Sequence, residues 1–338
     1  MSPVLVGLLR ILAVVGLMLA NGVVLIYMLR KVLGHLHLRL GPIHVGPKGV
    51  LQTLNDVLKL LTKEDIWPEG VDRVLFYLAP ILVFTPSLMA YAAIPFSDSL
   101  KVTDLETGLL YTLAILSFLP IGLLMAGWAS GSKWSLLGGM RAAGMQIAYE
   151  VPLLLSVLPV VMFAGTMNLT EIVAGQSGTW GGVIPRWNVL FPGFWPTFLL
   201  FVVASMIELN TTPFDMSEAD SELVSGYATE YSAMKFGLLF LSEFSNQFIA
   251  SALGVTLFFG GWMLPWVSAE AIAPVAPVIF MLKVYIGIFI MYWIRGTFPR
   301  LRIDQMMSLG WKWLIPANLV WLMVFGVVYK LYQLGSVS

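Results

Sequence analysis

The sequence predicts an all-α integral membrane protein with about eight transmembrane helices and an amphipathic interfacial helix in the first cytoplasmic loop. Of its 338 residues, 58% are hydrophobic and only 11% are charged, and the mean hydropathy is +0.85. Its apolar runs are long enough to cross a hydrocarbon core of ~30 Å. Because lipid offers the backbone no hydrogen-bond partners, such runs form helices, and the alternating pattern of a membrane β-barrel is missing.

Eight apolar runs are candidate spans, and the fifth is the shortest. The first run lacks a charged leader and a cleavage site, so we expect a helix there and not a removable signal. Residues 1–338 are expected to form a single transmembrane domain. The runs centre near residues 11–29, 74–95, 109–128, 142–165, 194–208, 233–262, 276–294 and 311–330.

Basic residues gather on one side of the membrane when successive loops are assigned alternately to its two sides. The positive-inside rule makes that side cytoplasmic and puts both termini on the far side. The acidic loops share the cytoplasmic side. We therefore expect a multi-pass protein of the bacterial inner membrane, in preference to an organellar inner membrane. The basic residues on the cytoplasmic side are Arg30, Lys31, Arg39, Lys48, Lys59, Lys63, Arg73, Lys133, Arg141, Lys235, Arg295, Arg300, Arg302 and Lys312.

The first cytoplasmic loop, residues 34–73, contains the predicted amphipathic helix. Two Gly-Pro turns precede a set of apolar residues at helical spacing. The helix is too short to span, so it should lie at the membrane interface. It is either an anchor for the loop or a lid or floor for an amphipathic ligand. The apolar set is Val50, Leu51, Leu54, Val57, Leu58 and Leu61.

The second distinctive loop, residues 209–232, is acidic. Thr212-Pro213-Phe214-Asp215 has the residue types of a helix start with proline at the first helical position, so a helix is expected there. Like charges at helical spacing oppose helix formation, so their gathering needs another reason. No basic residue follows them before Lys235. The acids from the end of the fifth run onward are Glu208, Asp215, Glu218, Asp220, Glu222 and Glu230.

Two further carboxylates, Glu150 and Glu243, lie inside apolar runs. A charge at mid-depth costs at least ~2.5–3.5 kcal/mol, so such residues usually face a protein interior or a wet cavity. With Glu208 and the acidic loop they predict a chain of carboxylates that relays protons; a cation entry funnel is the rival. Pro152 is expected to disturb its helix beside Glu150 and admit water. Lys283, the base inside a run, could pair with one of these acids.

Other chemistry has little support in the sequence. His35, His37 and His44 share a turn but lack further ligands at suitable spacing, so no metal site is predicted. The absence of cysteine excludes disulfides and cysteine-ligated iron–sulfur clusters in this chain. No nucleotide-binding loop or nucleophile triad appears, so a freestanding enzyme is not expected. Redox chemistry would then use the cofactor of a partner.

Four segments lie in order along nearly the whole chain: RLGPIHVGPKGVLQTLNDVLKLLTKED, RAAGMQIAYEVPLLLSVLPVVMFAGTMNLTEIV, TPFDMSEADSELVSGYATEYSAMKFGLLFLSEF and GTFPRLRIDQMMSLGWKWLIP. Together they resemble the family of the membrane-embedded H subunit of NADH:quinone oxidoreductase, respiratory complex I, as a divergent member. The run SELVSGYATEYSAMKF is the most specific part.

The resemblance implies a subunit of a proton-translocating oxidoreductase that is not catalytic alone. Its cytoplasmic loops would help to form the chamber where quinone, for example ubiquinone, is the substrate. The acids would couple quinone reduction to proton translocation. The chamber residues implied are Arg30, Arg39, His44, Asp56 and Lys59. The relay implied is Glu150, Glu208, Glu243, Asp215, Glu218, Asp220, Glu222 and Glu230.

The resemblance also implies partners. These are peripheral-arm subunits that carry the terminal iron–sulfur cluster, small membrane subunits, antiporter-like pumping subunits and lipids, with no nucleic acid; the chain itself would bind no cofactor. Two alternatives stay open at this point. One is the membrane subunit of a related hydrogenase-type complex, and the other is a structural anchor that has lost quinone chemistry.

The chain departs from the family pattern at three places near the expected chamber and the acidic loop. Leu29 stands where relatives carry an acid, and Ile43-His44 replaces Asn-Arg. Thr211 stands where relatives carry an arginine. Since an opposite charge favours the ionised form of a carboxyl group, we expect the acidic loop to retain its protons more tightly than in relatives.

Overall fold

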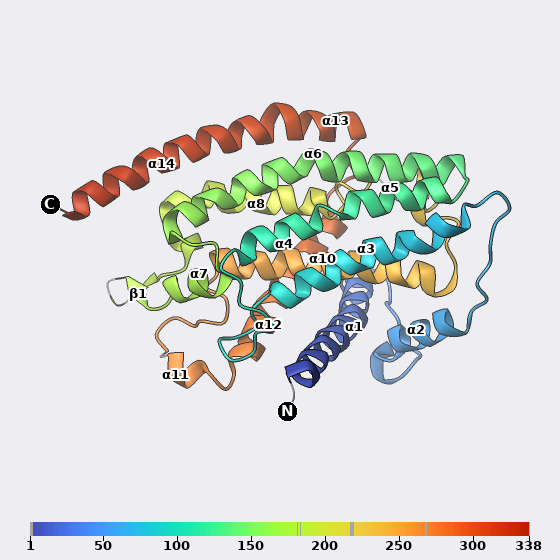
Figure 1. Ribbon diagram of the computed structural model, residues 1–338, viewed down its shortest axis with the longest axis horizontal. Helices are drawn as coiled ribbons and strands as arrows, with labels where there is room; N and C mark the ends of the chain where they lie inside the picture. The colour runs from blue at the N-terminus through green and yellow to red at the C-terminus, as the bar shows by residue number, and fades with distance from the viewer. Residues whose placement is uncertain (1–2, 181, 183, 217–219, 268, 338) are drawn as a thin grey trace.

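The computed structural model describes residues 3–180, 182, 184–216, 220–267 and 269–337 of the chain. They form a helical bundle with a single two-residue β-ladder in the described part (Figure 1). The α-helices are α1 Pro3–Leu36, α2 Gln52–Thr62, α3 Arg73–Ala93, α4 Gly108–Leu116, α5 Leu119–Ala129, α6 Lys133–Ala164, α7 Leu169–Gly175, α8 Trp195–Glu208, α9 Asp220–Leu223, α10 Ala233–Phe258, α11 Ala269–Ile272, α12 Ala276–Thr297, α13 Ile303–Ser308 and α14 Ile315–Val337; β1 Thr179–Trp180 pairs with β2 Ile184–Pro185.

Seven helical stretches among the described residues are long and apolar enough to cross a membrane. The fifth predicted run is α8, which is apolar but only 14 residues long. The all-helical membrane class predicted from the sequence is confirmed, with one short helix where an eighth full span was expected. The seven stretches are Gly7–Leu36, Arg73–Ala93, Gly108–Ala129, Lys133–Ala164, Ala233–Phe258, Ala276–Thr297 and Ile303–Leu331.

Proline has different effects in two of these stretches. The span formed by α4 and α5 is interrupted at Ser117-Phe118, just before Pro120. In α6, by contrast, Pro152 is buried within one continuous helix of 32 residues, so the local break predicted beside Glu150 is wrong. Neighbouring helices can compensate the single lost backbone hydrogen bond of an intramembrane proline, and α6 packs against both α5 and α8.

Helix α10 lies at the centre of the bundle. In its most apolar window 67% of the residues are buried, against 22% in α12 and 17% in the α13–α14 stretch. Its Phe244 and Phe248 are fully buried, and it contacts α3, α8 and α12. Helix α14 lies at the edge of the bundle in Figure 1. The central helix is therefore the one whose polar residues are furthest from lipid.

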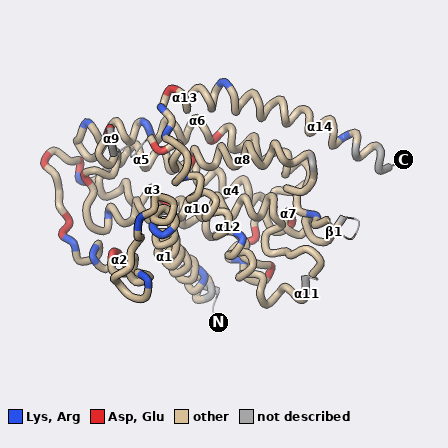
Figure 2. Tube along the Cα trace, turned by 180° about the vertical axis from the view of Figure 1, so that it is seen from behind, with Lys and Arg blue, Asp and Glu red and all other residues tan. Residues whose placement is uncertain are grey.

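Hydrogen bonds join several loops at the end of the bundle that carries α2. At the α2 end, the Ile66 amide donates to Ser232 Oγ (3.0 Å), the Asp72 amide to the Ala129 carbonyl (3.2 Å) and the Leu301 amide to the Pro213 carbonyl (3.0 Å). These contacts join loops that are distant in sequence. Figure 2 shows charged residues concentrated at this end, around α2 and α9.

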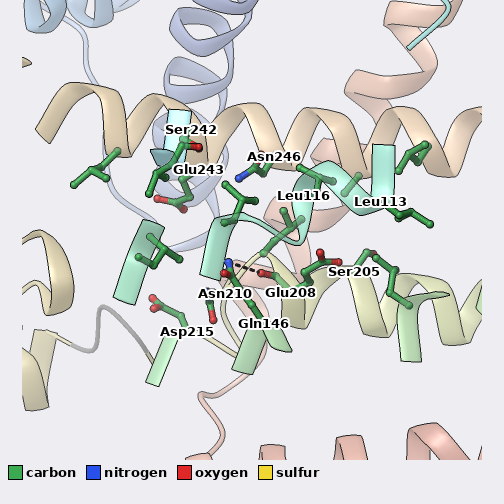
Figure 3. A pocket seen from close by; sticks show the side chains of 18 of the residues that line it. Leu113, Leu116, Gln146, Ser205, Glu208, Asn210, Asp215, Ser242, Glu243 and Asn246 are labelled. Carbon is green, nitrogen blue, oxygen red and sulfur yellow. Dashed lines mark hydrogen bonds between the residues drawn. The ribbon is translucent and has the colours of Figure 1, made fainter. Parts of the chain in front are cut away.

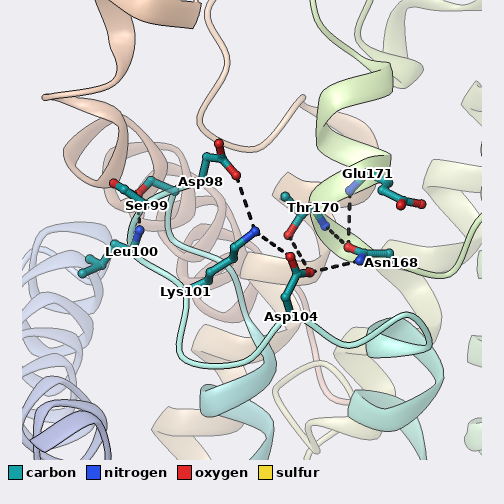
Figure 4. A network of polar contacts seen from close by, with 9 residues as sticks. Asp98, Ser99, Leu100, Lys101, Asp104, Asn168, Thr170 and Glu171 are labelled. Atoms are coloured by element: carbon teal, nitrogen blue, oxygen red, sulfur yellow. Dashed lines mark hydrogen bonds and ion pairs between the residues drawn. The ribbon is translucent and has the colours of Figure 1, made fainter. Parts of the chain in front are cut away.

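At the opposite end, a polar network joins the loop after α3 to α7 (Figure 4). Lys101 Nζ lies 2.5 Å from Asp104 Oδ2, and Asn168 Nδ2 donates to Asp104 Oδ1 (3.0 Å). The Lys101 ammonium and then the Asn168 amide lower the pKa of Asp104 below its ordinary value. Asn168 also caps α7 by accepting from the amides of Thr170 and Glu171. This network fixes the far loops to one another.

Lys283 of α12 binds the loop after α10 and not an acid. Its Nζ donates to the carbonyl oxygens of Phe259, Gly261 and Met263 at 2.8, 2.8 and 2.7 Å, and it lies 4.6 Å from the centre of the Trp187 ring. The expectation that Lys283 could pair with an intramembrane acid is wrong. A cation is favoured at the carboxyl end of a helix, where the helix dipole is negative.

Replacing Lys283 with Met should destabilise the far end of the bundle. Three carbonyl oxygens lose an ionic donor, and because water at the membrane surface replaces part of the loss, we expect about 1.5–3 kcal/mol, the value of one hydrogen bond to a charged group. The measurement is unfolding of the purified protein by a denaturing detergent. Lys312→Met, at an exposed position, is the control. Equal stability of the two variants would show that the three hydrogen bonds of Lys283 do not stabilise this end of the bundle.

Candidate functional site

The candidate site is an internal cavity at the meeting point of α3, α4, α5, α6, α8 and α10 (Figure 3). Its volume is about 60 Å³, and a water needs roughly 10–15 Å³, so a few waters fit. Leucines such as Leu113 and Leu116 cover one part of its wall. Glu208, Asp215 and Glu243 face the same space from three different segments. The cavity therefore brings together three of the acids that the sequence singled out.

Glu243 is held between two helices. Arg295 Nη1 of α12 lies 3.4 Å from its Oε1, and Gln247 Nε2, one turn further along α10, donates to the same oxygen (3.2 Å). The side chains of Glu243 and Arg295 are 17% and 20% exposed. Asp215 also acts on Glu243 electrostatically. The arginine stabilises an ionised carboxylate at this depth.

Glu208 and Glu150 form a second pair of acids. Glu208 ends α8, and its carbonyl accepts from Gln146 Nε2 (3.3 Å). Gln146 and Glu150 are four apart on α6 and share a face. The Glu150 charge acts on Glu208, although Gln146, and not Glu150, is the α6 residue beside Glu208 in the cavity wall. Three intramembrane acids thus come from α6, α8 and α10.

The helix predicted from Pro213 is wrong. Residues 211–216 form a turn, in which the Phe214 amide donates to the Thr211 carbonyl (2.8 Å), and the next helix in the described part is α9, Asp220–Leu223. Phe214 and Met216 are buried in a small apolar cluster with Met306. Residues two apart share a side in extended backbone and not in a helix. Packing of the two apolar side chains therefore competes with the helix start.

Basic residues distant in sequence compensate the acidic loop. Arg300 Nη2 lies 3.3 Å from Asp215 Oδ2, and Arg141 Nη1 lies 2.6 Å from Glu222 Oε2. Thr211 is 4% exposed, and its hydroxyl donates to the carbonyl of Met206 (3.1 Å). Arg300 thus supplies a positive charge beside Asp215, and Thr211 makes a local backbone contact.

The other predicted relay residues lie outside the cavity or outside the described part. Glu230 is half-buried and is not a lining residue. Glu218 lies outside the described residues. Asp220 begins α9, but its side chain belongs to the part that is not described. Among the loop acids whose side chains are described, Asp215 alone reaches the cavity.

The residues predicted for a quinone chamber lie at the α2 end, apart from the acid cavity. Arg30 of α1 pairs with Asp56 of α2, which also accepts from Gln52 Nε2 (3.0 Å). Arg39, His44 and Lys59 are exposed. The apolar face of the helix is exposed too, because α2 packs on α1 and α10 through a different face that includes Thr53; the exposed side chains are Leu51, Leu54, Leu58 and Leu61.

Several polar residues of the cavity were missed by sequence reasoning. Gln146 Oε1 and Asn210 Oδ1 are buried without a donor in the described part of the chain, and both residues line the cavity. Ser242 and Asn246 also line it, next to Glu243 along α10. Their spacing around Glu243 and Glu150 was a usable signal, since polar residues on an acid's helix face indicate a polar interior.

Several known proteins that are similar to this chain belong to one family. The family model described as NADH dehydrogenase matches residues 9–326. A protein of Brevibacillus brevis, named as the H subunit of NADH-quinone oxidoreductase, is 46% identical over 310 residues, which cover 92% of this chain and 89% of the relative. Proteins of the same name from Rhodospirillum centenum (42% over 315 residues, 93% and 91% covered) and Dehalococcoides mccartyi (43% over 311 residues, 91% and 83% covered) are also similar.

The apolar helices and the acids gathered at their centre define the class, a multi-pass membrane protein with a polar interior. Within that class, the chain belongs to the family of the H subunit of NADH-quinone oxidoreductase, and it is a membrane subunit of that complex. The family resemblance seen in the sequence is confirmed.

Replacing Phe214 with Ala should release the turn that carries Asp215. Phe214 is 8% exposed, and truncating a buried phenylalanine costs about 3–5 kcal/mol. The rate of amide hydrogen exchange in residues 209–216 should then rise at least about tenfold, because the free energy of local opening is lower. Phe298→Ala, at a residue 59% exposed, is the matched control. Unchanged exchange in the Phe214 variant would show that the apolar contact does not hold the turn.

Proposed function

We propose that this subunit couples quinone reduction to proton movement through the acids around the α6–α8–α10 cavity. The observation that carries the proposal is the convergence of Glu208, Asp215 and Glu243 on one internal space. The relatives, whose names make them subunits of an NADH-quinone oxidoreductase, supply the reaction, in which quinone is the electron acceptor. Their names favour the quinone branch over a hydrogenase-type complex or an inactive anchor.

The acids fall into an order from the loop end of the bundle inward. Asp215 lies in the loop after α8 and acts electrostatically on Glu243. Glu208 faces the same cavity, and Glu150 acts on Glu208 from α6. A few waters in the cavity, held by the acceptors Gln146 Oε1 and Asn210 Oδ1, would complete hydrogen bonds between carboxyl groups. Protons would then move between acids without an unpaired charge entering lipid.

The quinone would bind at the α2 end. Quinones are amphipathic, and the exposed leucine face of α2 offers an apolar surface for the tail. Arg30, Arg39, His44, Asp56 and Lys59 offer polar partners for the head. Electrons would come from an iron–sulfur cluster in a peripheral-arm partner. Two electrons arriving on the quinone would add two negative charges until two protons neutralise them. Reduction would therefore change the charge next to loops 34–73 and 209–232, which we place on the cytoplasmic side, for as long as those protons are missing.

Protons leaving the acids would pass to the small membrane subunits and antiporter-like subunits of the complex. In this arrangement the chain is a single transmembrane domain of the bacterial inner membrane. Its own contribution is to hold protons and to bind quinone, while partners supply the electrons.

Neutralising the three acids of α6, α8 and α10 should uncouple pumping. In inside-out membrane vesicles, Glu243→Gln, Glu208→Gln and Glu150→Gln should each lower the ratio of protons pumped to NADH oxidised, because Gln neither gains nor loses a proton. NADH oxidation by an artificial acceptor, which bypasses quinone, should stay the same. Glu171→Gln is the control, since this exposed glutamate accepts from Thr166 at the opposite end of the bundle. A normal pumping ratio in all three variants would sink the proposal.

Replacing Asp56 with Asn should weaken quinone binding without unfolding the protein. The side chains of Arg30 and Asp56 are 40% and 33% exposed, and such ion pairs contribute only about 0–1 kcal/mol to stability. We therefore expect a several-fold rise in KM for a short-chain quinone at unchanged stability, which would show that Asp56 contributes to quinone binding. Asp304→Asn, which breaks an exposed pair with Arg302, is the control. An unchanged KM would remove Asp56 from the chamber.

A further inference from the structure

Four polar side chains form a connected group between α10 and α12, next to the acid cavity. Glu243 and Gln247 are four apart on α10, and Tyr292 and Arg295 are three apart on α12, so each pair shares a helix face. The Tyr292 hydroxyl donates to Gln247 Oε1 (3.0 Å), and Gln247 Nε2 donates to Glu243 Oε1 (3.2 Å). Arg295 Nη1 completes the group at 3.4 Å from Glu243 Oε1.

The two oxygens of Glu243 are not equivalent in this arrangement. Both nitrogen donors reach Oε1, whereas Oε2 accepts no hydrogen bond from the described residues. Glu243 itself lines the cavity (Figure 3). When a carboxyl group is protonated, the proton sits on one oxygen, and an oxygen that already accepts two N–H groups is the less favourable place for it. Oε2 is therefore the oxygen available for proton exchange.

Glu243 and Tyr292 together fix the orientation of the Gln247 amide. The nitrogen and oxygen of a glutamine amide have nearly the same shape, so hydrogen-bond partners determine the orientation. An ionised carboxylate only accepts hydrogen bonds, so Nε2 faces Glu243, and the Tyr292 hydroxyl holds Oε1 on the other side by donating to it. Gln247 and Tyr292 are each only 1% exposed, so water does not compete for either group. A buried tyrosine thus fixes a buried amide, which fixes a carboxylate.

We propose that Gln247, oriented by Tyr292, is a positioning residue for Glu243. It holds Oε1 as a hydrogen-bond acceptor and leaves Oε2 as the oxygen that exchanges a proton with the cavity. Without Gln247 the carboxyl group can rotate and divide the proton between its two oxygens, so fewer conformations are ready for transfer. This inference rests on the proposed function, because it requires that Glu243 exchange protons.

The alternative is that Gln247 only satisfies buried polar groups. In that case its replacement would lower stability whether or not position 243 is ionisable. A positioning role instead depends on the Glu243 carboxyl group. Double substitution separates the two, since residues that act through one another are not additive.

The test uses the complete complex in inside-out vesicles, with Gln247→Met and Tyr292→Phe made alone and together with Glu243→Gln. Each single variant should slow proton pumping about fivefold, the rate factor for one lost hydrogen bond, and neither should slow it further beside Glu243→Gln. Tyr285→Phe is the matched control, because this tyrosine of α12 donates to Asn21 (2.6 Å) and not to Gln247. Its pumping should be normal.

A second measurement does not depend on activity. In the infrared difference spectrum of the purified complex, the carboxyl band that Glu243→Gln removes should shift to higher wavenumber in Gln247→Met and Tyr292→Phe, because its C=O group loses a donor. If Gln247→Met does not assemble into the complex, the more conservative Tyr292→Phe distinguishes a positioning role from a purely stabilising one.

Three results would overturn the inference. The first is normal pumping in Gln247→Met and Tyr292→Phe while Glu243→Gln is uncoupled, which leaves the proposed function in place. The second is the same loss in the presence and absence of Glu243, which assigns both residues to stability alone. The third is normal pumping in Glu243→Gln, which overturns the proposed function of Glu243 as well.

Discussion

The need to compensate charge inside a lipid-facing bundle is the constraint on which the rest of this structure depends. The central helix α10 carries Glu243 and is the most buried of the spanning helices. Arg295 reaches the acid from α12, and Asp215 comes to the same cavity from the loop after α8. Because each of these groups costs several kcal/mol if left alone in hydrocarbon, the helices that supply them must stay packed around α10. The packing of the core and the arrangement of the candidate site therefore depend on each other.

Much of the fold could be predicted from the sequence because it depends on local composition. Apolar runs located the spanning stretches, and the shortest run forms the short helix α8. The predictions failed where tertiary contacts competed with local signals. Thr212-Pro213-Phe214-Asp215 has the residues of a helix start, but Phe214 and Met216 pack in a buried cluster and Asp215 meets Arg300, 85 residues away. Pro152 does not break α6, because its neighbours hold the helix.

The candidate site was predictable in its acids but not in their partners. Glu150, Glu208 and Glu243 stood out because charge is rare in apolar runs. Arg300, Arg141 and Arg295 were visible as basic residues, yet nothing in their sequence positions linked them to particular acids. Lys283 was open to pairing with any acid and instead binds three carbonyl groups. Which residues pair across helices depends on how the helices pack, and the local sequence around each residue does not indicate that packing.

The position of Lys283 has an electrical consequence. Its ammonium group is a fixed positive charge at the far end of α10, whereas the carboxylates lie toward the other end of the bundle. A proton that travelled along α10 from Glu243 toward that end would approach a like charge in a medium of low dielectric, where repulsion acts over long distances. If the acids exchange protons as proposed, transfer across the bundle would avoid this repulsion, whereas transfer along α10 toward Lys283 would not.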